Sequence, residues 1–327
     1  MNALRLTLAG LFAALLGGCV SAPEATMAPS SPGNTPKFTN AGSANVALAD
    51  FQNSAFPYKG MVPPDDSNAK PRPFLDVDGV AHSSPRGGVL RADQTYNDPR
   101  VLIAAAPDFD PNSAGALVVL FHGNQATLAR DVVERQQAPR QLAQSSLNAV
   151  LLAPQMAVNA NDSSAGNFWR SGGFAAFLSE AEAKLAQMYP QASRGTFHNW
   201  PVIIVAYSVG YLPAAFSLQH GGAGDRVRGV VLMDALFGEP AKFADWIEKS
   251  SSQAFFVSAY SASTREQNRA LQARLRLDGV TTVNGLPDSL HSGVIAFVDA
   301  ENASHDDFLT AAWTRDPLND VLSRMGR

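Results

Sequence analysis

The sequence predicts an α/β protein in which helices cover both faces of a doubly wound, mostly parallel sheet. Three observations point to this fold class. After about residue 74, short apolar runs alternate with longer segments of helical period. The short runs are apolar almost without interruption, which is typical of strands that are covered on both faces. The regular alternation of strand and helix patterns favours helical crossovers between parallel strands.

The candidate strands are identified by their length and their aliphatic content. They cover residues 100–107, 116–123, 148–155, 201–208, 227–235, 254–261 and 293–300. The segments between them fit amphipathic helices. Residues 172–189, for example, place Phe174, Phe177 and Leu185 on one side, with charged residues mostly elsewhere.

The beginning of the chain has a different character. Arg5 followed by the apolar stretch 6–16 has the form of a secretory signal. The sequence Leu16-Gly17-Gly18-Cys19 then resembles the lipobox of bacterial lipoproteins. This resemblance implies that residues 1–18 are a lipoprotein-type signal peptide and that Cys19 is lipidated. It also implies an anchored protein of the bacterial cell envelope. Val20 favours the outer membrane in that family, facing the periplasm or the surface.

Residues 19–73 are rich in proline, serine, alanine, asparagine and glycine and show no sustained apolar period. Such a composition predicts a flexible tether between the lipid and the folded domain. Phe51, Phe56 and Tyr58 are the residues expected to dock part of this tether on the domain surface. The folded domain is therefore expected to cover residues 74–327.

Composition narrows the classes of partner. The formal net charge is -4 and there is no basic run, which argues against nucleic-acid binding. A small molecule or an envelope polymer is the expected substrate, whereas the oligomeric state is left open. Cys19 is the only cysteine, so an intrachain disulfide is excluded. No histidine pair has metal-ligand spacing with a carboxylate, and we expect neither a metal nor a cofactor.

Three residues with complementary chemistry lie just past predicted strands. Ser208 ends the strand at 201–208, Asp234 ends the strand at 227–235, and His305 follows the last strand. In doubly wound sheets the functional groups gather at the carboxyl ends of the strands. The sequence therefore predicts that a serine, an acid and a histidine meet at one edge of the sheet.

The segment Ala206-Tyr207-Ser208-Val209-Gly210 resembles the nucleophile elbow G-x-S-x-G of the α/β-hydrolase family, with alanine in place of the first glycine. The stretch "LFHGN" at 120–124 resembles the family's His-Gly oxyanion loop. The resemblance covers about residues 100–313. It implies an α/β-hydrolase fold with Ser208 as nucleophile and the backbone amides of Asn124 and Val209 as oxyanion donors.

A serine hydroxyl needs an adjacent base at neutral pH. His305 occupies the family's position for the catalytic histidine, whereas the rival His122 belongs to the oxyanion loop. The third member orients the histidine, and Asp234 is favoured for this role because some members of the family carry the acid on that strand. Asp299 and Glu301 are the alternatives.

These residues imply acyl transfer to water through an acyl-enzyme. We expect a carboxylic-ester hydrolase, with an envelope amidase or peptidase and a non-catalytic binding lipoprotein as the alternatives. The side chains expected to shape the substrate pocket are His122, Gln155, Trp169, Tyr207, Phe237 and Tyr260. For Trp169 the alternative is that its ring only packs against the following helix.

Overall fold

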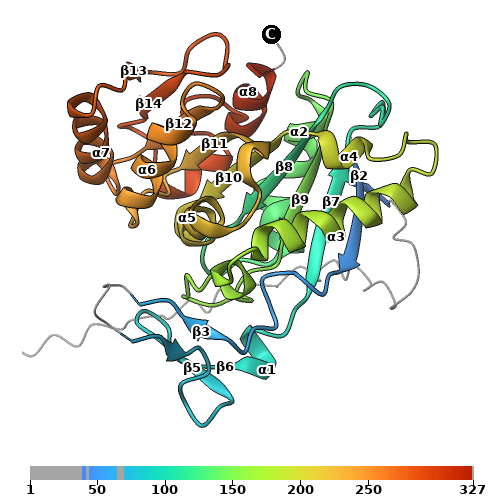
Figure 1. The fold of residues 1–327 in the computed structure, drawn as a ribbon, viewed down its shortest axis with the longest axis vertical. Coiled ribbons are helices and arrows are strands. Elements are labelled where there is room, and N and C mark those ends of the chain that lie inside the picture. Colours follow the sequence, from blue (N-terminus) through green and yellow to red (C-terminus); the bar gives the residue numbers. More distant parts are fainter. Residues whose placement is uncertain (1–38, 42–43, 65–69, 326–327) are drawn as a thin grey trace, which may run out of the picture.

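A ten-stranded sheet forms the centre of the protein (Figure 1). The structure is a computed structural model that describes residues 39–41, 44–64 and 70–325. The predicted signal peptide 1–18 and Cys19 lie outside the described residues. In spatial order the strands are β1 (Thr39–Ala41), β2 (Ala44–Asp50), β7 (Arg100–Ala105), β9 (Ala149–Pro154), β8 (Ala116–Phe121), β10 (Val202–Tyr207), β11 (Val227–Met233), β12 (Phe255–Tyr260), β14 (Ile295–Asp299) and β13 (Val283–Asn284).

The sheet is antiparallel at one side and parallel elsewhere. β2 pairs antiparallel with β1 and β7, and β7 pairs antiparallel with β9. From β9 to β13 all neighbouring strands are parallel. The chain passes from β8 to β9 on one side and then returns to β10 on the other. The winding therefore reverses between β8 and β10, where sheets of this kind bind their ligands.

Helices cover both faces of the sheet, as the apolar runs predict. On β8, Leu117 and Val119 join a core cluster shared with α3, α5 and α6, whereas Val118 and Leu120 join a second cluster shared with α2 and α8. The helices are α1 (Ala92–Thr95), the π-helix η1 (Leu128–Arg135), α2 (Ala138–Ala143), η2 (Gly166–Trp169), α3 (Gly173–Met188), α4 (Thr196–Asn199), η3 (Ser208–Gly210), α5 (Tyr211–His220), η4 (Gly224–Arg226), α6 (Pro240–Ser250), α7 (Arg265–Leu277), η5 (His305–Leu309) and α8 (Pro317–Ser323). This arrangement is the α/β-hydrolase fold, and the predicted fold class is confirmed.

The predicted boundary between tether and domain at residue 74 is wrong. β2 is a full member of the central sheet, with Val46 opposite Ala104 of β7. Phe51 and Phe56 are buried in the core, and the Phe51 ring lies 5.4 Å from that of Phe177. The prediction failed because the β2 segment is alanine-rich and lies in a polar, proline-rich region, and because the partners of these aromatic side chains are far away in the sequence.

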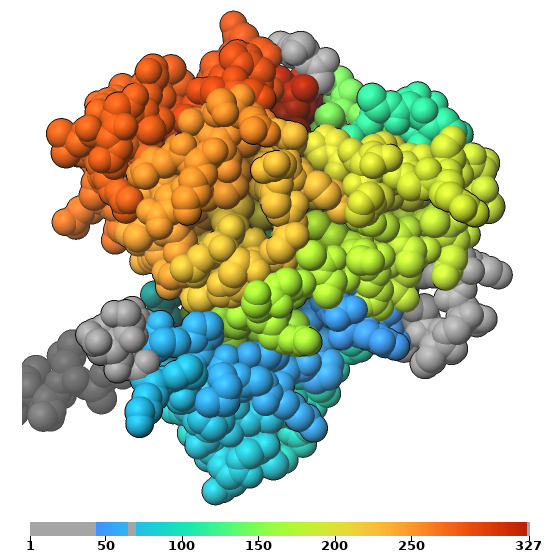
Figure 2. Space-filling view, in the orientation of Figure 1, coloured from blue at the N-terminus to red at the C-terminus, as the bar shows by residue number. Residues whose placement is uncertain are grey.

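Residues 51–64 and 70–96 form a small lobe at the carboxyl end of the parallel strands (Figure 1). The lobe contains α1 and two hairpins, β3 (Met61–Val62) with β4 (Arg72–Pro73) and β5 (Ala81–Ser84) with β6 (Gly88–Arg91). Figure 2 shows it, coloured blue to cyan, packed against the green part of the chain. Its interior is an aromatic cluster in which the Phe74 ring lies 4.8 Å from Tyr96 and 5.7 Å from Trp169. Burying one such ring contributes about 1.5–3 kcal/mol, so the aromatic cluster stabilises the packing of the lobe on the domain.

Two further observations concern the described residues only. None of their helices is both long enough and apolar enough to span a membrane. Their histidine and acidic side chains also form no group of three or more that could hold a metal ion.

Candidate active site

Ser208 stands at a tight turn between β10 and α5. Its φ angle is 56°, in the left-handed region that side chains other than glycine rarely adopt. The chain just after Ser208 packs closely on β8, because a Cβ on Gly210 would lie 2.3 Å from the carbonyl oxygen of Phe121. Glycine is therefore required at 210, whereas the extra methyl of Ala206 is accommodated in the core. Strain of this kind is typical of functional sites.

Two hydrogen bonds connect Ser208, His305 and Asp234. His305 Nε2 lies 2.8 Å from Ser208 Oγ, and His305 Nδ1 lies 2.7 Å from Asp234 Oδ2. Ionised Asp234 can only accept, so Nδ1 carries the proton and donates it. Nε2 is then free to accept a proton from the serine hydroxyl. The structure thus brings together the three residues that the sequence places at the carboxyl edge of the sheet.

Asp234 is held ionised by a set of donors. Ser261 donates from its backbone N–H to Oδ1 at 3.1 Å and from its hydroxyl to Oδ2 at 2.7 Å, and the Thr264 hydroxyl also donates to Oδ1. Burial by itself raises the pKa of the Asp234 carboxyl, but the hydrogen bonds from His305, Thr264 and Ser261 outweigh it and hold the pKa below its ordinary value. The carboxylate is therefore charged at neutral pH.

Aromatic rings fix the orientation of the His305 imidazole. The Tyr207 ring stacks on it at 5.2 Å between centroids, and the Phe237 ring meets it edge-on at 5.6 Å. The Tyr207 hydroxyl donates to the His305 carbonyl at 3.3 Å. Burial raises the pKa of Tyr207 to about 12, so the hydroxyl keeps its proton. Tyr207 and Phe237 both line the cavity that Ser208 and His305 also line, which we call the catalytic cavity, as predicted.

The predicted pocket role of His122 and Gln155 is wrong. Both side chains are buried behind the loop at the end of β8. The Met156 backbone N–H donates to His122 Nε2 at 2.9 Å, and the Gln155 amide lies 3.0 Å from the same atom. His122 Nδ1 therefore carries the proton and donates to the Gly123 carbonyl at 2.8 Å. The prediction failed because a polar residue after a strand can point inward when local backbone groups satisfy it.

This arrangement orients the predicted oxyanion donors. In a trans peptide the C=O and N–H point in opposite directions. Because His122 holds the Gly123 carbonyl, the Asn124 N–H points away from it. Asn124 lines the same cavity as Ser208. Val209 lies in the first turn of the helical segment that begins at Ser208, where backbone N–H groups lack helical partners. The oxyanion roles of both amides remain predictions.

Two other predicted pocket residues belong to the core. The Trp169 ring packs into the aromatic cluster with Tyr58 and Phe74, so it neither closes over an acyl group nor packs mainly on the following helix. Tyr260 is buried and is not among the residues lining the catalytic cavity. The sequence could not show that Trp169 packs against Tyr58, a residue assigned to the tether, and against Phe74 at the start of the predicted domain.

The alternative acids lie elsewhere. The Asp299 carboxylate is 3.5 Å from the Arg265 guanidinium and 3.8 Å from that of Arg269. Glu301 is 3.7 Å from the same Arg265 group. Neither contacts His305.

The catalytic cavity has a volume of about 430 Å³. It is lined by Arg86, Asn124, Gln125, Arg135, Tyr207, Ser208, Phe237, Ser263, His305 and Asp306. Sequence reasoning missed five of these: Arg86, Gln125, Arg135, Ser263 and Asp306. Gln125, Ser263 and Asp306 are close in sequence to predicted site residues, which was a usable signal. No signal marked Arg86, because its segment belonged to no predicted strand or helix of the domain.

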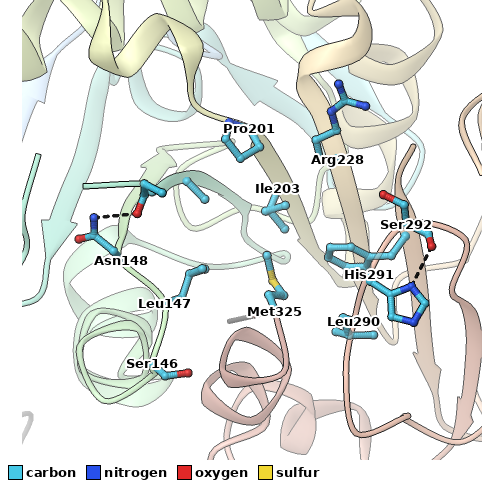
Figure 3. A pocket seen from close by; sticks show the side chains of 14 residues that line it. Ser146, Leu147, Asn148, Pro201, Ile203, Arg228, Leu290, His291, Ser292 and Met325 are labelled. Carbon is cyan, nitrogen blue, oxygen red and sulfur yellow. Dashed lines mark hydrogen bonds between the residues drawn. The ribbon is translucent and has the colours of Figure 1, made fainter. Parts of the chain in front are cut away.

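A second cavity of about 450 Å³ lies at the opposite, amino-terminal edge of the strands (Figure 3). Leu147, Ile203 and Met325 line it, so its wall is largely apolar. Its histidine, His291, hydrogen-bonds through Nδ1 to the Ser292 carbonyl. This cavity contains no serine, histidine and acid in contact.

Comparisons with known proteins add fold relatives only. No family model matches the chain, and no curated protein matches it in sequence. The structure is similar to the feruloyl esterase module of Clostridium thermocellum, at 12% identity and a TM-score of 0.46 over 85% of this chain and 96% of that one. It is also similar to an esterase from Pseudomonas putida, at 14% identity and 0.37 over 70% and 74%. A third similar structure is an IroE-like serine hydrolase from Shewanella oneidensis, at 13% and 0.39 over 64% and 72%.

Proposed function

We propose that this protein is a serine hydrolase that cleaves a carboxylic ester through Ser208, His305 and Asp234. The observation that carries the proposal is the unbroken pair of hydrogen bonds from Ser208 through His305 to a buried, ionised Asp234. A structural serine would need neither a left-handed φ nor a histidine within proton-transfer distance. A non-catalytic binding module would have no use for the strain stored at Ser208.

The geometry suits a two-step acyl transfer. Ser208 Oγ attacks the ester carbonyl carbon while His305 Nε2 takes its proton, and Asp234 stabilises the imidazolium that forms. The amides of Asn124 and Val209 receive the developing oxyanion. His305 then returns the proton to the departing alcohol. The acyl group stays on Ser208 as an ester. A water molecule, deprotonated by the same nitrogen, releases the acid. The His305 side chain is 32% exposed, so water can reach it.

The test is the release of nitrophenolate from p-nitrophenyl esters of increasing acyl length, compared with p-nitroanilides of the same acids. We expect a burst of nitrophenolate equal to the enzyme concentration and no comparable turnover of the anilides. Equal turnover of the anilides would reassign the protein as an amidase. The absence of any turnover, with the site intact, would leave only a binding protein.

The lipid anchor is a separate proposal that depends on the sequence. We propose that Cys19 is acylated after removal of residues 1–18 and holds the protein at a bacterial envelope membrane. Each buried CH₂ of an acyl chain contributes about 0.8 kcal/mol, so several chains together anchor stably. Cys19→Ser is expected to move the protein from the membrane fraction to the soluble fraction, measured by fractionation and blotting. Unchanged membrane association would refute the anchor and leave the hydrolase proposal intact.

A further inference from the structure

Two arginines from distant parts of the chain line the catalytic cavity. Arg86 lies in the turn between β5 and β6 of the small lobe, and Arg135 ends the π-helix η1. The proposed acyl transfer uses neither of them. We propose that they bind a carboxylate on the substrate, so that the enzyme acts on esters that carry a negative charge. This inference rests on the proposed function and names its substrate class.

The turn that carries Arg86 is fixed against the catalytic domain. The Ser84 hydroxyl donates to the Asn161 carbonyl at 2.9 Å, and the Gly87 N–H donates to the same hydroxyl at 3.3 Å. A Cβ on Gly87 would lie 2.8 Å from the Asn161 carbonyl oxygen, so only glycine allows this approach. The lobe therefore delivers Arg86 to the cavity at a defined place.

The Arg86 guanidinium is not used by the fold. Among residues 39–41, 44–64 and 70–325 it makes no hydrogen bond or ion pair. Its side chain is exposed at the cavity. An arginine that is placed by a fixed turn and left without a partner is available to a ligand, and its planar fork suits a carboxylate.

Arg135 is only partly neutralised. Its Nε donates to Asp131 Oδ1 at 3.1 Å. The same carboxylate also accepts from Arg130 Nε at 3.0 Å. Burial by itself raises the pKa of Asp131, but hydrogen bonds from Thr127 and Arg130 hold it below its ordinary value. The single negative charge of Asp131 is therefore shared by the guanidinium groups of Arg130 and Arg135. Together these three side chains carry one excess positive charge.

The charge facing the cavity matches a single carboxylate. The charged side chains that line it are Arg86, Arg135 and Asp306, and His305 is neutral when it accepts from Ser208. Asp306 accepts from the Tyr207 hydroxyl at 3.5 Å. The wall thus carries one excess positive charge, although the whole chain has a net charge of -4. Because Asp131 and Asp234 lie directly behind Arg135 and His305, this excess favours a ligand with one negative charge over a ligand with two.

The experiment uses matched charged and neutral esters. On the acyl side, mono-p-nitrophenyl succinate is compared with p-nitrophenyl pentanoate. On the alcohol side, 4-acetoxybenzoate is compared with 4-acetoxybenzamide. In at least one pair we expect the charged ester to have the higher kcat/KM, by about 10-fold or more, as hydrogen bonds to a charged group allow. Salt should reduce this preference and leave the neutral ester unaffected.

Substitution of each arginine tests whether the preference for charged esters depends on Arg86 and Arg135. R86Q and R135Q should each raise KM for the charged ester with kcat maintained, and should each reduce the ratio of kcat/KM for the charged ester to kcat/KM for its neutral match. R228Q is the matched control, because Arg228 lies at the opposite edge of the sheet and bonds Gln253. Equal kcat/KM within both pairs, or an unchanged preference in both variants, would overturn the carboxylate site while the hydrolase stands. No turnover of any ester would instead reject the proposed function.

Discussion

Ser208→Ala should reduce kcat by about 10⁶-fold, to the level left by binding and backbone donors alone. The alanine removes the oxygen that His305 Nε2 contacts, so no acyl-enzyme can form. The fold should persist, because a methyl group fits the space of the serine Cβ. The variant is measured by nitrophenyl ester turnover, with thermal unfolding as the check on folding.

Ser217→Ala is the matched control for this substitution. Ser217 is a buried serine of α5 whose hydroxyl has no hydrogen-bond partner among the described residues. It lies on the helix that follows Ser208 but does not line the catalytic cavity. Full activity is expected. Substantial turnover by Ser208→Ala, or loss of activity in Ser217→Ala, would show that the assigned nucleophile is wrong.

Asp234→Asn should lower kcat by about 10⁴-fold with little change in KM. An asparagine keeps the shape, and its oxygen can still accept from the Ser261 N–H and the Thr264 hydroxyl. Its NH₂ group then faces His305 Nδ1, where it can only donate. The imidazole must place its proton on Nε2, and that nitrogen can no longer accept from Ser208. Steady-state kinetics with a neutral nitrophenyl ester measure the effect.

Asp299→Asn is the control variant for Asp234→Asn. Asp299 pairs with Arg265 and Arg269 and makes no contact with His305, so this variant should retain activity. Unchanged turnover in Asp234→Asn together with a large loss in Asp299→Asn would transfer the orienting role to Asp299. Such a result would require His305 to adopt a different position from that seen here.

The catalytic geometry could be foreseen because it depends on strand ends. Ser208 and Asp234 each directly follow a strongly apolar strand, and the carboxyl ends of parallel strands meet at one edge of the sheet. His305 follows the last strand of the same sheet. Once the alternation of strands and helices is recognised, these three residues have few other places to lie.

The substrate side of the site could not be foreseen in the same way. Arg86 reaches the cavity through a lobe whose core is formed by Phe74, Tyr96 and Trp169. Those residues are far apart in the sequence and follow no period, so the sequence pattern did not reveal the lobe. His122 shows the opposite case, a polar residue at a strand end that is turned inward by backbone donors. Such long-range contacts and backbone hydrogen bonds cannot be predicted from the residues next to a position in the sequence.

The most direct measurement of the central claim is reaction with a fluorophosphonate at neutral pH, followed by peptide mapping. The claim is that His305 makes the Ser208 hydroxyl nucleophilic, and the reagent reports that property without any assumption about the substrate. The wild-type protein should carry one adduct, on Ser208, and His305→Ala should not react. An unreactive wild type, or an adduct on the neighbouring Ser263, would contradict the account.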